Sequence, residues 1–177
     1  MGQLQQPQGY ELRQYAADAY LFTTIRGNTY TIRFIRYWQE DALSVYLDVE
    51  AEIYEIYFEI VEIKDRGYDR KIQHTIMKTI LDFLEQDNRI GFFDINREDG
   101  RGLENLRVYR MWLRMYERGV KKRSTMINRI VRIPDQSDSH IACVAHSNNT
   151  LFMDRSADQM MDLVLKEIFP GADLEAF

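Results

Sequence analysis

The first alternations of apolar and polar positions predict a β-hairpin. Two runs rich in β-forming residues, Tyr20–Ile25 and Thr29–Tyr37, flank the short turn sequence Arg26-Gly27-Asn28. Glycine and asparagine tolerate the positive backbone angles that tight hairpin turns need. We therefore expect two antiparallel strands in the first part of the chain.

The stretch Val49–Ile63 predicts a long strand with an irregularity. Its apolar residues occupy odd positions first and even positions later: Val49, Ala51 and Ile53, then Ile56, Phe58 and Ile60. Because side chains alternate between the two faces of a strand, such a change of phase requires an extra residue. The pattern therefore predicts a β-bulge between Ile53 and Ile56, and bulges are common beside active sites.

Helical and strand periodicities alternate in the rest of the chain. Apolar residues recur every three or four positions in Lys71–Leu84 and in Leu103–Arg118, which predicts two amphipathic helices. Three further apolar runs predict buried strands, and a last helix begins after an N-capping serine. These elements are the strands Arg89–Asn96, Thr125–Ile133 and His140–His146, and the helix Ser156–Phe169.

The composition is that of one folded domain. Hydrophobic residues make up 45% and aromatic residues 12% of the 177 residues, which is enough for a sizeable core. No apolar run approaches the ~20 residues that a membrane-spanning helix needs, and a single cysteine, Cys143, excludes an internal disulfide. We expect a cytoplasmic protein with a disordered tail over residues 1–9 and a single domain over residues 10–177.

Basic residues gather in one segment of an otherwise acidic chain of net charge −5. The range 101–132 holds ten Lys and Arg residues against two acids, whereas the remainder holds 13 basic and 26 acidic residues. Four of these arginines share one stripe of the second helix, and three basic residues continue it: Arg107, Arg110, Arg114 and Arg118, then Lys121, Lys122 and Arg123. This segment either pairs with the acidic stretch Asp48–Glu62 of the same chain or attracts an acidic partner.

The order of elements from about Asp48 to His146 is informative. A bulged strand, a polar turn, a helix, a buried strand, a second helix and two strands follow one another. This order resembles the second half of the GNAT N-acetyltransferase fold. The resemblance implies an α/β (α+β) fold with a mixed, mostly antiparallel central sheet and helices on both faces. It also implies that backbone exposed by the bulge bonds the pantetheine arm of acetyl-CoA.

The turn after the long strand corresponds to the place where GNAT proteins wrap the pyrophosphate of acetyl-CoA. The family pattern there is Gln/Arg-x-x-Gly-x-Gly/Ala, and this chain has Arg66-Gly67-Tyr68-Asp69-Arg70-Lys71. Arg66 fits, but Asp69 and Lys71 stand where the family has small residues that let backbone N–H groups approach phosphates. The alternative is that Asp69 only caps the following helix. The resemblance implies cofactor contacts from Ile63, Lys64, Arg66, Gly67, Arg70 and Lys71.

The second helix carries a degenerate version of another GNAT motif. Asn105-x-x-Val108-x-x-Met111-Trp112 keeps the family spacing, but Trp112 stands where a tyrosine serves as general acid, and an indole cannot replace its hydroxyl. Tyr109 and Tyr116 are the substitute candidates, and the alternative is that all three are core aromatics. Glu55 on the long strand is the candidate general base, although acids on one strand more often form a solvated face.

These features favour a binding protein over an enzyme. We expect a protein of GNAT-like fold that has no cofactor. It should contact a macromolecular partner, first an acidic protein, through Arg107–Arg123. The alternatives are an N-acyltransferase that uses acetyl-CoA or another acyl-CoA, a sequence-independent nucleic-acid binder, and a homodimer through the acidic strand of a second copy. No metal site or membrane association is expected. Asp99-Gly100-Arg101 before the second helix also resembles an uncharacterised bacterial family, which adds no activity.

Overall fold

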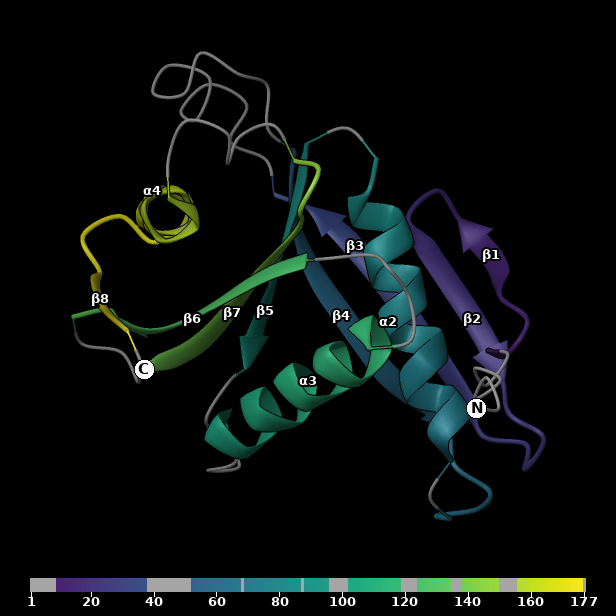
Figure 1. Ribbon diagram of the computed structural model, residues 1–177. Coiled ribbons are helices and arrows are strands. Elements are labelled where there is room, and N and C mark those ends of the chain that lie inside the picture. Colours follow the sequence, from purple (N-terminus) through teal and green to yellow (C-terminus); the bar gives the residue numbers. More distant parts are fainter. Residues whose placement is uncertain are drawn as a thin grey trace.

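The computed structural model describes residues 9–37, 52–67, 69–86, 88–95, 102–118, 124–134, 138–149 and 156–176. These segments form a mixed α+β fold in which helices pack against an eight-stranded, mostly antiparallel sheet (Figure 1). The strands are β1 (Arg13–Ala16), β2 (Ala19–Thr23), β3 (Thr29–Arg36), β4 (Glu52–Glu62), β5 (Arg89–Ile95), β6 (Ser124–Arg132), β7 (Ser139–His146) and β8 (Asp173–Ala176). The described helices are α2 (Arg70–Leu84), α3 (Gly102–Glu117) and α4 (Ala157–Ile168). None of these helices has the length and apolar character that crossing a bilayer requires.

The strand order in the sheet is β1-β2-β3-β4-β5-β7-β6-β8. Every adjacent pair is antiparallel except β4 and β5, which run parallel. A parallel pair needs a crossover connection, and α2 supplies it because it lies between β4 and β5 in the chain. The sheet is therefore organised around one parallel junction between two antiparallel halves.

The predicted helices and strands are confirmed, with small shifts at their ends. In the hairpin turn, the Gly27 N–H donates to the Thr24 carbonyl at 2.9 Å, and Gly27 has the positive φ of 81° that such a turn requires. Ser156 caps α4 by accepting from the Gln159 N–H. β1 and β8 were not predicted, because each is only four residues long and lies at an edge of the sheet.

The predicted bulge between Ile53 and Ile56 is wrong. β3 and β4 pair without interruption from Tyr54 to Ile60, and the register shifts only at Val61. The apparent change of phase arises because β4 is buried on both faces where it begins, with Ile53 5% and Tyr54 3% exposed. The Tyr54 hydroxyl donates to the Glu52 carboxylate at 2.8 Å. A tyrosine whose hydroxyl has a partner behaves as a core residue.

β4 and β5 separate after a short parallel contact. They pair from Glu52↔Arg89 to Glu55↔Phe92, whereas β4 stays paired with β3 to its end and β5 stays paired with β7 as far as Ile95. Figure 1 shows the two strands starting together and diverging toward their C-terminal ends, with α3 running across the opening. We call this opening the fork. The fork lies further along β4 than the predicted bulge.

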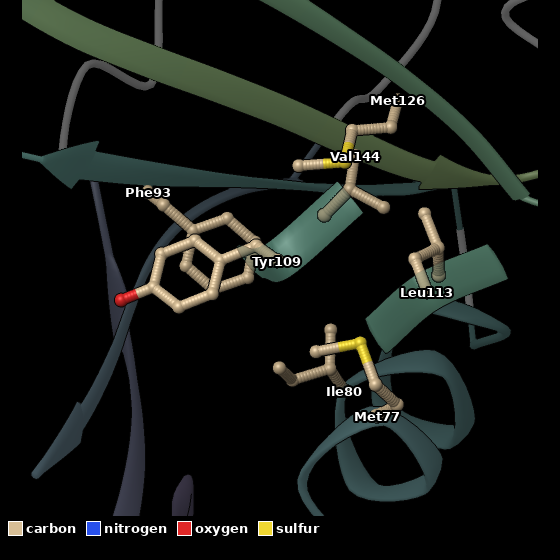
Figure 2. Close-up of a pocket in the computed structure, with 7 residues that line it drawn as sticks. All are labelled: Met77, Ile80, Phe93, Tyr109, Leu113, Met126 and Val144. Atoms are coloured by element: carbon tan, nitrogen blue, oxygen red, sulfur yellow. The ribbon is translucent and has the colours of Figure 1, made fainter. Parts of the chain in front are cut away.

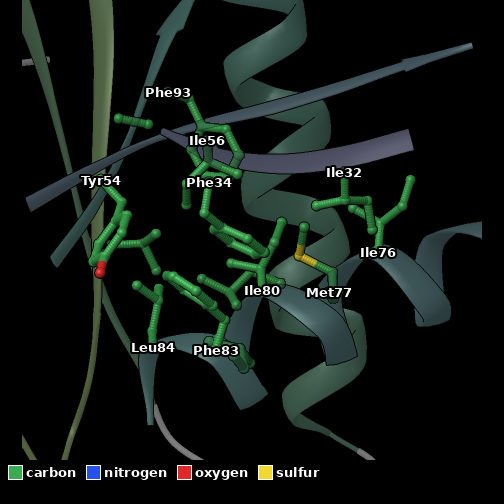
Figure 3. Packing of buried hydrophobic residues seen from close by; sticks show 14 of the residues in the cluster. Ile32, Phe34, Tyr54, Ile56, Ile76, Met77, Ile80, Phe83, Leu84 and Phe93 are labelled. Carbon is green, nitrogen blue, oxygen red and sulfur yellow. The ribbon is translucent and has the colours of Figure 1, made fainter. Parts of the chain in front are cut away.

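Alternate residues of β7 enter two apolar clusters. Ala142 and Val144 lie in a cluster with residues of α2 and α3, and Ile141 and Cys143 lie in a second cluster with residues of α4. Since successive side chains of a strand point to opposite sides, we call these the α3 side and the α4 side of the sheet. The α3-side cluster is the larger, and Figure 3 shows the rings and aliphatic chains that fill it.

A buried guanidinium fixes α4 to the sheet. Arg129 on β6 is 6% exposed. Its Nε donates to Asp162 and its Nη2 donates to Asp158, both at 2.7 Å, and its Nη1 donates to the carbonyl of Asn128 at 3.0 Å. A buried charge is tolerated only when it is paired and hydrogen-bonded. The contact therefore ties the position of α4 to that of β6.

Removing the two carboxylates should cost more stability than removing the guanidinium. Asp158→Ala with Asp162→Ala leaves Arg129 buried without an ionic partner, and we expect a loss of about 3 kcal/mol. Arg129→Met leaves two carboxylates that water can reach, and we expect a loss of about 1 kcal/mol. Urea unfolding of the three proteins measures both values. Equal losses would show that the burial of Arg129 does not control the contact.

Candidate functional site

The backbone of the turn between β4 and α2 is bound by a side chain of the N-terminal hairpin. The Asn28 side chain is 3% exposed. Its Oδ1 accepts from the N–H groups of Lys64 and Asp65 at 2.7 and 2.9 Å, and its Nδ2 donates to the Asp65 carbonyl at 2.5 Å. Two amides at the start of the turn are therefore already satisfied within the chain.

Two further amides of the turn bind carboxylates of the turn itself. The Gly67 N–H donates to Asp65 Oδ1 at 2.7 Å, and the Lys71 N–H donates to Asp69 Oδ1 at 2.8 Å. The bond from Gly67 is the first cause that holds the pKa of Asp65 below its usual value. Asp69 is the N-cap of α2, so the capping interpretation of this residue is confirmed. An incoming phosphate would have to displace these acceptors.

Two further side chains cover the turn. The Arg26 guanidinium pairs with Asp65 at 3.0 Å and lies against Gly67, where an added Cβ would overlap it. The Tyr10 hydroxyl donates to Asp69 Oδ2, and the Tyr10 N–H donates to Thr75 Oγ1 at 2.8 Å. The pKa of Tyr10 is raised by burial and then by this bond to Asp69. Residues before β1 and in the hairpin thus close the start of α2.

The candidate cofactor residues therefore lie around a closed turn. Their side chains are exposed or half-buried, but the amides of Lys64, Gly67 and Lys71 are engaged. The residues of this set are Ile63, Lys64, Arg66, Gly67, Arg70 and Lys71. Their charged groups remain on the surface, beside four backbone amides that already have acceptors within the chain.

Tyr109 is the α3 tyrosine that lies at the fork. Its ring packs against Phe58 of β4 and Phe93 of β5, with ring centroids 5.2 Å apart in both pairs. It lines a small apolar cavity with residues of α2 and the sheet, and Figure 2 shows its hydroxyl pointing away from Leu113 and Met77. Burial raises the pKa of this hydroxyl to about 12. The ring of Trp112 also packs beside Phe58, with ring centroids 6.0 Å apart.

Tyr116 lies elsewhere on α3. It is 6% exposed, and its ring packs against His74 of α2 with centroids 5.1 Å apart. Burial, followed by the charge of Lys78, lowers the pKa of His74. Because Tyr116 belongs to the contact between α2 and α3, only Tyr109 of the two candidates is brought to the fork.

Glu55 lies at the fork on the opposite side of the sheet from Tyr109. The pKa of Tyr57 is raised to about 12. The largest cause is a hydrogen bond with Glu55, and burial and the charges of Glu55 and Asp94 add to it. The pKa of Asp94 on β5 is raised by burial and then by Glu55, while a bond with Ser139 opposes the shift. Sequence reasoning missed Tyr57 and Asp94. A single acid inside the apolar run of β5 was the signal that could have revealed Asp94.

The four arginines of α3 form an exposed ridge. Arg107, Arg110, Arg114 and Arg118 are all exposed, and Leu106 and Leu113 on the other side of the helix are buried. Among the described residues none of these four guanidiniums has an acidic partner. We call these four residues the arginine ridge. The predicted continuation, Lys121, Lys122 and Arg123, lies outside the described residues.

Three of the four acids of β4, all except Glu55, pair with cations outside the arginine ridge. Glu52 pairs with Arg36 at 3.2 Å and with Arg89 at 3.1 Å, and Glu59 pairs with Arg33 at 3.2 Å. Glu62 pairs with Lys64 at 3.2 Å. Between the described acids of this stretch and the arginine ridge, the predicted neutralising pairs are therefore absent; Asp48 and Glu50 lie outside the described residues.

Other candidate chemistry is sparse in the described segments. No group of three or more His, Cys, Asp or Glu side chains there is arranged to hold a metal ion. Cys143 is fully buried, and burial raises the pKa of its thiol to about 12.

Comparison with protein families finds no family model that matches the chain, and a search of curated proteins finds no match either.

Asp94 should make stability depend on pH. Its raised pKa means that the folded chain holds this proton more tightly than the unfolded chain, so stability falls as pH rises from the unfolded pKa through the folded one. We expect Asp94→Asn to be more stable than the wild type at pH 7 and no more stable at about pH 3, where the unfolded carboxyl is also protonated. Urea unfolding at both pH values tests this, with Asp173→Asn on β8 as control. A benefit that is equal at both pH values would contradict it.

Proposed function

We propose that this chain is a binding protein of GNAT-like fold that docks an acidic macromolecular partner on the arginine ridge. The partner class that fits best is an acidic protein. The observation that carries the proposal is a row of four exposed arginines that have no acidic partner among the described residues, on a helix whose other side is buried.

The strand order supports the GNAT-like part of the proposal. One parallel pair, β4 and β5, is joined by a helix and opens at its C-terminal ends, and β7 lies between β5 and β6. The two apolar clusters use opposite sides of β7, as helices on both faces of the sheet require. The predicted order of elements between Glu52 and His146 agrees with this arrangement.

The closed turn supports binding over acyl-CoA chemistry. A pyrophosphate is held by free N–H groups at a helix start. Here the amides of Lys64, Asp65, Gly67 and Lys71 are hydrogen-bonded to Asn28, Asp65 and Asp69. The two bonds to Asn28 are part-buried, so a ligand that took these amides would have to compensate for their loss.

The ridge has the properties of a docking surface. Its arginines recur every three or four residues, so they form one stripe about 16 Å long. Guanidiniums bind carboxylates in a bidentate manner, which gives orientation as well as attraction. Packing of Leu106, Leu113 and Tyr116 holds the helix in place, so little backbone order has to be gained when a partner binds.

An acidic protein fits this surface better than a nucleic acid. The chain as a whole carries a net charge of −5, which repels a long polyanion away from the ridge. Binding of single strands uses exposed aromatic side chains between the cations, whereas Tyr109 and Trp112 point their rings toward Phe58 at the fork. An acidic helix or loop can contact the stripe without meeting the rest of the surface.

Charge reversal on the ridge should abolish partner capture. We expect Arg110→Glu with Arg114→Glu to reduce recovery of the partner from native extract at least tenfold, because two attractive contacts become repulsive. Quantitative mass spectrometry of captured proteins measures the effect. The matched control is Arg13→Glu with Lys166→Glu, two exposed cations on β1 and α4 with the same change in net charge.

Two results would contradict the proposal. If the control variant loses the same proteins, the effect is one of net charge and not of the ridge. If mixed DNA and RNA bind at low salt and the ridge variant alone releases them, the partner is a nucleic acid. Sedimentation velocity of the wild type shows whether a second copy occupies the ridge.

A second candidate function is acyl-CoA-dependent N-acyltransfer. The specific observation in its favour is that Tyr109 and Glu55, candidates for general acid and base, lie on the two sides of the fork. In this reading an amine would lose a proton to Glu55, and the departing thiolate would take one from Tyr109.

Calorimetry with acetyl-CoA separates the two functions. Because the amides of the turn are occupied, we expect no binding heat at millimolar acetyl-CoA. The matched variant Asn28→Ala frees the amides of Lys64 and Asp65. If weak binding of acetyl-CoA is detected in either protein, we expect it in this variant and not in the wild type. Saturable binding to the wild type would instead support the acyltransferase and argue against the closed turn as a barrier.

A further inference from the structure

The edge of β4 that faces the fork carries unused backbone groups. The Tyr37 N–H donates to the Ile53 carbonyl at 2.8 Å, which places the backbone groups of odd-numbered β4 residues toward β3. Since these groups alternate in direction along a strand, those of Phe58 and Ile60 point into the fork. Pairing with β5 has ended by then, at Glu55. In the described part of the chain, no strand pairs with Phe58 or Ile60 on that side.

The α3 side of this edge is apolar. Phe58 packs in the fork against Tyr109 and Trp112. Ile60, on the same phase of the strand as Phe58, is 47% exposed near the C-terminal end of β4. A side chain that entered the fork on this side would meet rings and aliphatic groups and would exclude water from them.

The α4 side of the same edge is acidic. Glu55 and Asp94 lie near enough for the charge of Glu55 to act on Asp94, and neither carboxylate has a cationic partner among the described residues. The surface beside them is partly apolar, with Ile35 46% and Tyr57 41% exposed. A cation placed here would relieve the repulsion between the two carboxylates.

We propose that the free edge of β4 binds an extended peptide as an added strand. The peptide carries Lys or Arg side chains on one side, against Glu55 and Asp94, and apolar side chains on the other. An exposed strand edge is a template for another chain, and such strand addition uses backbone bonds for affinity and alternate side chains for selectivity. The segment from Ile56 to Ile60 contains no proline or lysine that would block it.

This site is separate from the arginine ridge in position and in charge. The ridge faces solvent on α3 and selects an acidic partner, whereas the fork presents carboxylates and selects a basic strand. The inference therefore goes beyond the proposed function, and the ridge variants leave it untouched. Failure of one proposal does not decide the other.

Hydrogen exchange followed by NMR tests the edge directly. In the free protein we expect fast exchange for the amides of Phe58 and Ile60 and slow exchange for those of Tyr57 and Glu59, which face β3. Addition of the peptide acetyl-Val-Lys-Val-Lys-Val-Lys-Val-amide should slow exchange at Phe58 and Ile60. The same peptide with Glu in place of Lys should not.

Matched variants identify the contacts. Ile60→Pro removes an N–H that faces the fork and keeps the pairing with β3, so it should weaken the Lys peptide about tenfold relative to Ile60→Val. Glu55→Gln with Asp94→Asn should weaken it by about as much and remove the preference over the Glu peptide. Slow exchange of core amides shows that each variant is folded.

Several outcomes would overturn the proposal. Equal binding by Ile60→Pro and Ile60→Val would exclude strand addition, and equal protection by both peptides would exclude the acidic side as the selector. Slow exchange of Phe58 and Ile60 in the free protein would show that the edge is already paired. Protection of these amides by millimolar acetyl-CoA and not by the peptide would show that the edge binds an acyl-CoA instead.

Discussion

The short parallel contact between β4 and β5 is the constraint on which the rest of the structure depends. The two strands share only the pairs from Glu52↔Arg89 to Glu55↔Phe92, because each is held further along by a different antiparallel neighbour. At Gly91 the contact is so close that an added Cβ would overlap the side chain of Ile56. Beyond this base the strands diverge, and the aromatic side of α3 fills one side of the opening.

α3 contributes to two surfaces because its aromatic residues and its arginines lie on different sides of the helix. Tyr109 and Trp112 pack toward the fork, while the arginine ridge faces solvent. The same helix therefore connects an apolar contact that maintains the opening of the sheet with a cationic surface that no described acid neutralises. Glu52, Glu59 and Glu62 of β4 pair with Arg33, Arg36, Arg89 and Lys64 instead of with the ridge.

Regular elements were predictable from sequence because periodicity reports burial directly. The helices α2, α3 and α4 and the longer strands were expected from their apolar spacing, and Ser156 and Asp69 from capping chemistry. The predicted bulge was wrong, because Tyr54 was left out of the apolar pattern although its hydroxyl binds Glu52 and its ring is buried. A prediction from strand alternation depends on how every residue is classed as apolar or polar, and one amphipathic residue was enough to make it wrong.

The candidate site was less predictable because its contacts join distant parts of the chain. Asn28 binds Asp65 across 37 positions, and Tyr10 binds Thr75 across 65. Neither pairing leaves a local pattern. The exposure of the arginines followed from helical geometry, whereas the lack of acidic partners among the described residues depended on which cations pair with the acids of β4. The grouping of Glu55, Tyr57 and Asp94 depended on the register of two strands that are connected only through a helix.

The contacts that close the turn also bear on how the molecule comes apart. Tyr10, Arg26 and Asn28 each attach the N-terminal hairpin region to residues at or near the start of α2. Because the three attachments are close together and share the same short segment, loosening any one of them disturbs the others. We therefore expect the hairpin and the first turn of α2 to open together.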